Sequence, residues 1–112
     1  DVYIYDSATD IWAMGPSIEP RGTAGAAVYC GGIYLFGGES QAQMKNLDDV
    51  FRLDLKRNVW ESVSPMPNAR KFVRAVVFMN SIYIVGGSTV LATSHSPIGS
   101  ASVERFLQPG CP

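Results

Sequence analysis

The sequence has 112 residues, of which 46% are hydrophobic and 17% are charged, and its formal net charge is −1. This composition excludes a disordered chain, and the scattered basic residues argue against a nucleic-acid partner. No apolar run approaches the roughly 18 to 20 residues that span a bilayer, so we expect no membrane partner. Because the chain opens in strand-like sequence, we expect it to be part of a longer polypeptide.

The first predicted element is a β-hairpin. Val2–Asp6 and Ile11–Met14 are rich in strand-forming residues, and the turn segment Ser7–Asp10 separates them. Tyr5 and Trp12 lie symmetrically about the centre of this turn, so we predict that they are cross-strand partners. Such an aromatic pair adds about 0.2–1 kcal/mol to sheet stability relative to an Ala–Ala pair.

A second pair of strands follows. Ala24–Cys30 is an apolar strand, a turn is expected at Gly31–Gly32, and Ile33–Phe36 forms the next strand. Gly37–Gly38 then stops this run, because glycine adopts backbone angles that other residues resist and lets another backbone come close. The predicted loop after the glycines, Glu39–Asp49, has 11 residues.

The chain then repeats this order, beginning with a second aromatic hairpin. Val50–Leu55 and Val59–Val63 predict two paired strands in which Leu53 and Trp60 are cross-strand partners. The loop Ser64–Arg70 follows, as Pro16–Gly22 follows the first hairpin.

The second copy of the inner strands runs from Val73 to Val85. Val73–Met79 and Ile82–Val85 are predicted strands, with a turn at Asn80–Ser81 and the glycine pair Gly86–Gly87 after them. Val76–Met79 is continuously apolar rather than alternating, which predicts a strand that is buried on both faces.

Equivalent residues recur at offsets of 48 or 49, which indicates a repeat architecture. The pairs are Asp6/Asp54, Trp12/Trp60, Arg21/Arg70, Tyr34/Tyr83 and Gly37/Gly86. A third copy begins after the predicted 15-residue loop Ser88–Ser102, because Val103–Phe106 aligns with Val50–Leu53 at an offset of 53.

In this order the repeated residues resemble the kelch repeat. The residues that carry the resemblance are Gly37–Gly38, Leu53–Asp54, Trp60, Pro65–Met66–Pro67, Arg70 and Ile82–Gly87. The resemblance implies an all-β fold, a kelch-type β-propeller whose blades are four-stranded sheets. About two blades are present, so we expect a partial propeller.

The resemblance also predicts where the blades begin and end. Residues 1–18 end one blade, residues 20–66 form a complete blade, residues 68–107 form most of a next blade, and residues 108–112 are a tail. Propellers close with typically 4 to 8 blades, so the ring needs more blades in the same polypeptide or other copies of the chain. We therefore expect the isolated chain to be poorly stable or to self-associate.

Two departures from the kelch pattern weaken its signature in places. Leu53 stands where the pattern has Tyr, and no Asp follows the aromatic Phe106. The last strand is therefore not expected to continue into a normal hairpin.

Residue types that carry chemistry are few and scattered. His95 is the only histidine, and the chain has neither a GxSxG motif nor a recognisable triad. Cys30 and Cys111 have no metal-ligand spacing, so we expect Cys30 to be a small buried hydrophobe, Cys111 to be exposed, and the setting to be reducing and cytoplasmic. Asp48–Asp49 is expected to cap or solvate a turn. We predict no catalytic, metal or cofactor site.

Binding fits this chain better than catalysis, since propellers carry variable loops on rigid sheets. The resemblance implies that one face bears the loops after each glycine pair and those entering the next blade. The partner-binding candidates on that face are Thr23, Lys45, Asn46, Lys71, Phe72 and His95. Lys71 and Phe72 place a charge and an aromatic ring at a loop tip, although ordinary packing explains them as well.

The other repeated residues are expected to be structural. They are Tyr5, Trp12, Arg21, Gly37, Gly38, Leu53, Trp60, Arg70, Gly86 and Gly87. For Arg21 and Arg70 we favour hydrogen bonds to loop carbonyls between blades, and the alternative is a side chain that faces a ligand.

Three functions are left open. The amino-acid sequence of the repeats is most similar to that of the kelch domains of BTB–kelch proteins. This resemblance implies a protein-recognition propeller that presents substrates to a cullin-3 ubiquitin ligase. No BTB segment lies in these residues, so the cullin-3 link requires a domain elsewhere. The alternatives are an actin-binding scaffold and a kelch-like enzyme acting on carbohydrate, which the lack of a copper-ligand set disfavours.

Overall fold

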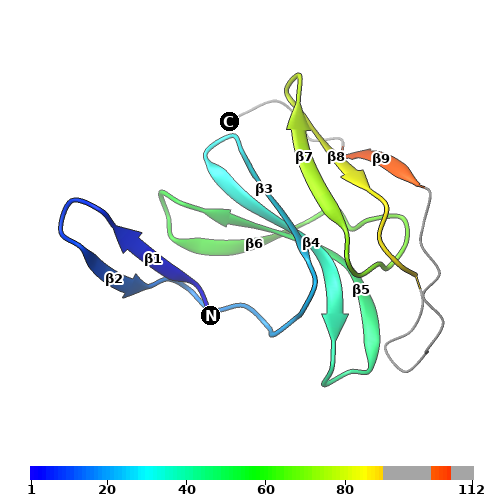
Figure 1. The fold of residues 1–112 in the computed structure, drawn as a ribbon, viewed down its shortest axis with the longest axis horizontal. Coiled ribbons are helices and arrows are strands. Elements are labelled where there is room, and N and C mark those ends of the chain that lie inside the picture. The colour runs from blue at the N-terminus through cyan, green and yellow to red at the C-terminus, as the bar shows by residue number, and fades with distance from the viewer. Residues whose placement is uncertain (90–101, 107–112) are drawn as a thin grey trace.

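The computed structural model describes residues 1–89 and 102–106. Over these residues the chain is all-β, with nine strands in three antiparallel sheets (Figure 1), which confirms the predicted fold class. No helix in the described ranges is long and apolar enough to cross a membrane. His95, Cys111, the tail at 108–112 and most of the predicted loop Ser88–Ser102 lie outside the described residues.

The first sheet is a two-stranded hairpin of β1 (Tyr3–Asp6) and β2 (Ile11–Met14). Tyr5 pairs with Trp12 as predicted, and their ring centroids are 5.0 Å apart. The Asp6 carboxylate accepts a hydrogen bond from the Ala8 N–H at 2.9 Å, which closes the turn. Every residue of both strands is exposed, and the hairpin projects from the rest of the molecule (Figure 1).

The central sheet has four strands in the order β3–β4–β5–β6. They are β3 (Gly25–Tyr29), β4 (Gly32–Ser40), β5 (Lys45–Asp54) and β6 (Val59–Val63). Leu53 pairs with Trp60 across β5 and β6, which confirms the second predicted hairpin.

The tight turn between β3 and β4 lies one residue earlier than predicted. Tyr29 pairs with Gly32, so the two turn residues are Cys30 and Gly31, with φ values of 50° and 71°. Positive φ at both positions is the type I′ geometry that suits the twist of a hairpin. Gly32 is a strand residue, and a Cβ there would lie 2.7 Å from Nε of Arg52, whose side chain covers it.

The predicted loop Glu39–Asp49 is wrong. β4 continues through the glycine pair to Ser40, with a bulge between Phe36 and Gly38, and β5 begins at Lys45. Only residues 41–44 are left as the turn. The prediction failed because a glycine pair usually marks the end of a strand, whereas here it forms a bulge within a long hairpin.

The third sheet has the order β7–β8–β9, with β7 (Arg74–Phe78), β8 (Ser81–Val85) and β9 (Val103–Phe106). Its tight turn is Met79–Asn80, with φ values of 46° and 60°, and again lies one residue before the predicted position.

The core lies between the central and third sheets. Tyr34 and Phe36 of β4 are buried, as are Ile82 and Ile84 of β8. The ring of Phe106 from β9 lies 5.7 Å from that of Tyr34 and 5.5 Å from that of Phe36. These contacts bury aromatic and aliphatic surface from strands far apart in the sequence, and this burial holds the two sheets together.

Two sequence-based interpretations are wrong. The stretch Val76–Met79 is not buried, since Val76, Phe78 and Met79 are 52%, 60% and 82% exposed. Within the described residues, no further sheet covers that face. Cys30 packs partly buried against the core, as expected of a small hydrophobe, but it is disulfide-bonded, which contradicts the reducing setting expected from the cysteines. The predicted blade limits remain predictions.

Candidate functional site

One edge of the central and third sheets gathers most of the segments singled out from the sequence. We define the loop edge as residues 19–23, 39–45 and 71–72. Gly22 and Glu39 exchange two backbone hydrogen bonds of 2.9 Å. The residues 49 positions later, Lys71 and Ser88, form the same bridge with bonds of 3.0 and 2.8 Å. The repeat in the sequence is therefore a repeat in backbone pairing.

Backbone hydrogen bonds also join one repeat to the next at this edge. The Phe72 N–H donates to the Thr23 carbonyl at 2.9 Å, and the Gly38 N–H donates to the Arg70 carbonyl at 2.9 Å. The Arg70 N–H donates to the Leu47 carbonyl at 3.1 Å. With these groups paired, the loop edge is one connected platform rather than a set of independent loops.

Thr23 and Phe72 occupy equivalent, unusual backbone positions. Their φ values are 57° and 56°, in the left-handed region that residues with a Cβ seldom adopt. Phe72 is 54% exposed, so this strained backbone holds an aromatic ring in solvent. Strained residues persist where the surrounding structure holds them, and they cluster at functional sites.

Lys71 lies beside this ring but is not a free cation. Its Nζ is 2.7 Å from Oε2 of Glu39 and 5.8 Å from the centroid of the Phe72 ring. The ion pair links the third sheet's entry loop to β4. The arrangement presents the aromatic ring of Phe72 and keeps the charge of Lys71 compensated.

The remaining candidates differ in what they expose. Lys45, at the start of β5, is exposed, whereas Asn46 is only 7% exposed and pairs with Glu39 in the sheet ladder. The side chain of Asn46 therefore has little surface to offer a partner. His95 lies outside the described residues. The structure thus brings together Thr23, Lys71 and Phe72 among the predicted binding residues.

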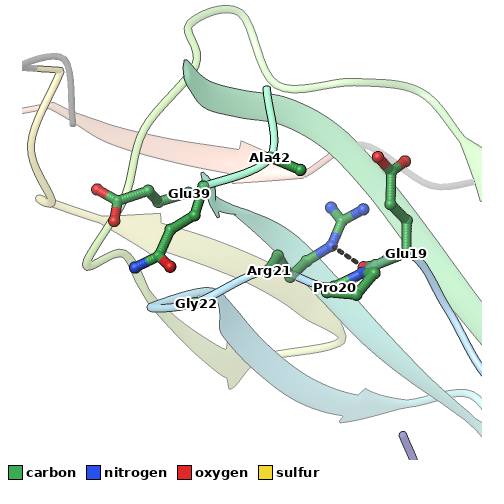
Figure 2. A pocket seen from close by; sticks show the side chains of 7 residues that line it. Glu19, Pro20, Arg21, Gly22, Glu39 and Ala42 are labelled. Atoms are coloured by element: carbon green, nitrogen blue, oxygen red, sulfur yellow. Dashed lines mark hydrogen bonds between the residues drawn. The ribbon is translucent and has the colours of Figure 1, made fainter. Parts of the chain in front are cut away.

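A hollow of about 390 Å³ opens at the loop edge (Figure 2). Its lining residues are Glu19, Pro20, Arg21, Gly22, Glu39, Gln41 and Ala42. The Arg21 Nε donates to the Glu19 carbonyl at 3.3 Å, as Figure 2 shows, and the Gln43 side-chain amide donates to the Glu19 carboxylate at 2.6 Å. Sequence reasoning missed Glu19, and only its position just before the repeated Arg21 could have indicated it.

The chain matches the family model for the kelch motif over residues 20–67. This chain carries kelch repeats. Its curated relatives include Kelch-like protein 7 of Rattus norvegicus, 34% identical over 85 residues, and Kelch repeat and BTB domain-containing protein 8 of Homo sapiens, 33% identical over 94 residues. The alignments cover 75% and 81% of this chain but only 14% and 16% of the relatives.

A solved structure has a similar arrangement of strands. Its title is "Structure of YjhT", and the superposition covers 70% of this chain and 25% of the YjhT chain, with a TM-score of 0.64 and 25% sequence identity. The chain is therefore a partial β-propeller, and its central sheet is a four-stranded blade.

The two kelch arginines are buried structural residues. Arg21 forms a two-pronged ion pair with Asp49 and contacts the Gly37 carbonyl at 3.5 Å. Arg70 donates to the Gly86 carbonyl at 2.9 Å and to the Glu104 carboxylate at 2.8 Å. The predicted hydrogen bonds to carbonyls are confirmed, but each arginine binds the glycine of its own repeat rather than that of a neighbouring blade.

The kelch tryptophan on β6 has a specific polar contact. The Trp60 indole N–H donates to the Pro16 carbonyl at 2.9 Å, which ties the segment after β2 to the central sheet. This is the usual arrangement for a partly buried Trp, whose N–H needs a partner.

The shifted pKa values belong to structural groups rather than to a reactive site. Burial raises the pKa of Tyr34 above its ordinary value. Hydrogen bonds from the backbone N–H groups of Arg57 and Lys56 lower the pKa of Asp54 at the β5–β6 turn. In the described part of the chain no three His, Cys, Asp or Glu side chains are grouped so as to hold a metal ion.

Proposed function

We propose that this chain supplies part of the protein-binding face of a kelch propeller, and that the loop edge is this face. The observation that carries the proposal is the exposed ring of Phe72 on a backbone of positive φ. An aromatic side chain held in one place binds a partner at a low cost in conformational entropy. Aromatic anchors of this kind contribute most of the binding energy at protein interfaces.

The surroundings of Phe72 support the same proposal. Thr23, whose carbonyl accepts the Phe72 N–H, adds a hydroxyl group nearby, and the paired charges of Lys71 and Glu39 form a polar rim. The hollow at Glu19 gives the loop edge a concave part for a side chain of the partner. An apolar anchor with a polar rim is the common anatomy of a protein interface.

We further propose that the polypeptide containing this chain is a substrate adaptor that binds rather than catalyses. The adaptor would reach a cullin-3 ubiquitin ligase through a BTB domain outside these residues. The support is that curated relatives are Kelch-like proteins, one of which is named for its BTB domain. This chain spans about one seventh of their length, as the 14% and 16% coverage shows.

The test of the binding face compares Phe72→Ala with Leu55→Ala in the polypeptide that contains this chain. Leu55 is similarly exposed, at 50%, but lies in the β5–β6 turn, away from the loop edge. Quantitative mass spectrometry of proteins co-purified from cells is the measurement. We expect Phe72→Ala to lower the yield of a bound protein at least about tenfold and Leu55→Ala to leave it unchanged. Equal yields for both variants would contradict the proposal.

The adaptor role is tested separately in the same samples. Cullin-3 should co-purify equally with the wild type and with Phe72→Ala, because the proposed BTB contact does not involve the loop edge. The absence of cullin-3 from the wild-type sample would overturn the adaptor role and leave the binding face to be judged by the first comparison.

A further inference from the structure

The hollow at the loop edge carries one negative charge that no described residue compensates. Its ionic groups are Glu19, Arg21 and Glu39. Arg21 is compensated by its two-pronged pair with Asp49, and Glu39 is compensated by Lys71 at 2.7 Å. Within the described ranges Glu19 forms no ion pair, and the segments outside those ranges contain no Lys or Arg.

The Glu19 carboxylate is held in place but keeps room for another donor. The Gln43 side-chain amide donates to Oε1 of Glu19 at 2.6 Å, which joins the segment before β3 to the β4–β5 turn. That turn is itself fixed, because the Gln43 N–H donates to the Ser40 hydroxyl at 3.1 Å and Ser40 is 1% exposed. A carboxylate has about four acceptor positions, so the exposed Glu19 can accept from a partner as well. Figure 2 shows the carboxylates of Glu19 and Glu39 on opposite sides of Arg21.

The chemistry of the hollow fits one basic side chain better than a small molecule or a metal ion. Small-molecule pockets are lined mostly by apolar and aromatic groups, whereas three of the seven residues that line this hollow are charged. A calcium ion takes about six to eight oxygen ligands, which one unpaired carboxylate does not supply. A Lys or Arg side chain needs only that carboxylate, and its methylene stem can lie along Pro20 and Ala42, which also line the hollow.

The hollow and the Phe72 ring are neighbours on the loop edge. Gly22 lines the hollow, and the carbonyl of the next residue, Thr23, accepts the Phe72 N–H at 2.9 Å. This connection keeps the Cα atoms of Gly22 and Phe72 within about 11 Å, the length of roughly three extended residues. Glu39 also lines the hollow, and its carboxylate pairs with Lys71, which precedes Phe72. One short extended segment can therefore reach both the hollow and the ring.

We propose that the loop edge binds an extended segment of a partner protein that places a Lys or Arg side chain in the hollow, beside Glu19. An apolar side chain about two to four residues away in that segment packs on Phe72. This inference rests on the proposed binding face and adds the kind of partner that the face selects. A basic side chain gains a charge-assisted hydrogen bond from Glu19, whereas an acidic side chain meets a like charge there.

The selection is local rather than a property of the net charge of the loop edge. Lys45 is the other charged side chain of the loop edge without an ion pair in the described part of the chain, and it does not line the hollow. Exposed charges act over roughly 8 Å at physiological ionic strength. The preference for a basic residue should therefore hold at one position of the bound segment, and it should weaken as salt is added.

Selection of phage-displayed random linear peptides on the polypeptide that contains this chain tests the proposal. We expect the selected peptides to be enriched in Lys or Arg about two to four residues from an apolar residue. Selection on Glu19→Gln should keep the apolar residue and lose the basic one. This variant should fold, which circular dichroism checks, because the new side-chain carbonyl can accept the same bond from Gln43. Asp48→Asn is the matched control, since Asp48 is an exposed carboxylate that does not line the hollow, and its selection should match that of the wild type.

Fluorescence anisotropy with a selected peptide then measures the contribution of the charge pair. We expect Glu19→Gln to raise the dissociation constant about fivefold and Asp48→Asn to leave it unchanged. Replacing the basic residue of the peptide by Gln should weaken binding to the wild type by the same factor and should have almost no effect on binding to Glu19→Gln, because the two changes remove one interaction.

The outcomes separate this inference from the proposed binding face. Selected peptides without a basic residue, or a basic residue that Glu19→Gln still selects, would overturn the inference. If such peptides nevertheless fail to bind Phe72→Ala, the binding face stands and only the basic side chain is wrong. Peptides that bind Phe72→Ala and Glu19→Gln as well as they bind the wild type would contradict both. If the wild type selects no peptide, the loop edge does not bind a linear segment and the inference is wrong, while the co-purification experiment still decides the binding face.

Discussion

Arg21 and Arg70 show how far one residue type can be predicted from a repeat. Both arginines bind the carbonyl of the first glycine in their own repeat, but their acidic partners are not equivalent positions. Arg21 pairs with Asp49 and stacks 5.1 Å above Phe51, whereas Arg70 pairs with Glu104, the counterpart of Phe51. The sequence therefore predicts the arginines, but it does not predict the acids, because each repeat compensates the charge from a different position.

Gly37 joins two repeats and has no room for a side chain. Its φ is 56°, and a Cβ would lie 2.6 Å from the Arg70 carbonyl oxygen. We expect Gly37→Ala to lower the free energy of unfolding by about 1–3 kcal/mol through backbone strain alone. Urea unfolding measures the change, and Gly22→Ala, where a Cβ meets nothing within 4 Å, is the matched control. Equal stability of the two variants would show that the close approach at Gly37 is unimportant.

At the scale of elements, short-range patterns predicted pairing well and long-range contacts poorly. Symmetry about each turn gave the partners Tyr5–Trp12 and Leu53–Trp60, which the strand registers confirm. The end of β4 was predicted wrongly, because glycine is needed at Gly37 for the close approach of the Arg70 backbone. Arg70 lies more than thirty residues away in the sequence, so no local pattern indicates this contact. The exposed ring of Phe72 could be suggested, but its positive φ could not, since no glycine marks that position.

The β1–β2 hairpin depends on few contacts with the rest of the molecule. The hydrogen bond from the Trp60 indole to the Pro16 carbonyl is one of them. We expect Trp60→Phe to cost about 1 kcal/mol and to act locally, by loosening the segment that leads out of β2. Hydrogen exchange should then rise at Tyr5 and Trp12 and stay constant at Tyr34 in the core. A uniform rise across all three amides would mean that Trp60 stabilises the whole sheet instead.

At the scale of the whole molecule, the fold is a section of a propeller ring, and apolar side chains are exposed at both ends of this section. The core joins only two sheets, while Val76, Phe78 and Met79 at one end and Trp12 at the other remain more than half exposed. Apolar surface left in water contributes nothing to folding, so the stability of the isolated chain should be small. The expected self-association of the isolated chain would bury part of this surface, so its stability should then depend on its concentration.

Thermal unfolding of the 112-residue chain at several concentrations tests this link. If association stabilises the folded chain, Tm rises with protein concentration, because the bound partner favours the folded state by mass action. At a hundred times the dissociation constant the gain is about 2.7 kcal/mol, which for a domain of this size shifts Tm by roughly 10 °C. Val76→Glu, which places a carboxylate on the exposed apolar side of β7, should melt at the low-concentration Tm of the wild type whatever its concentration. A sharp wild-type transition at the same temperature at every concentration would show that the two sheets are stable alone and that association through the exposed apolar surface does not stabilise the fold.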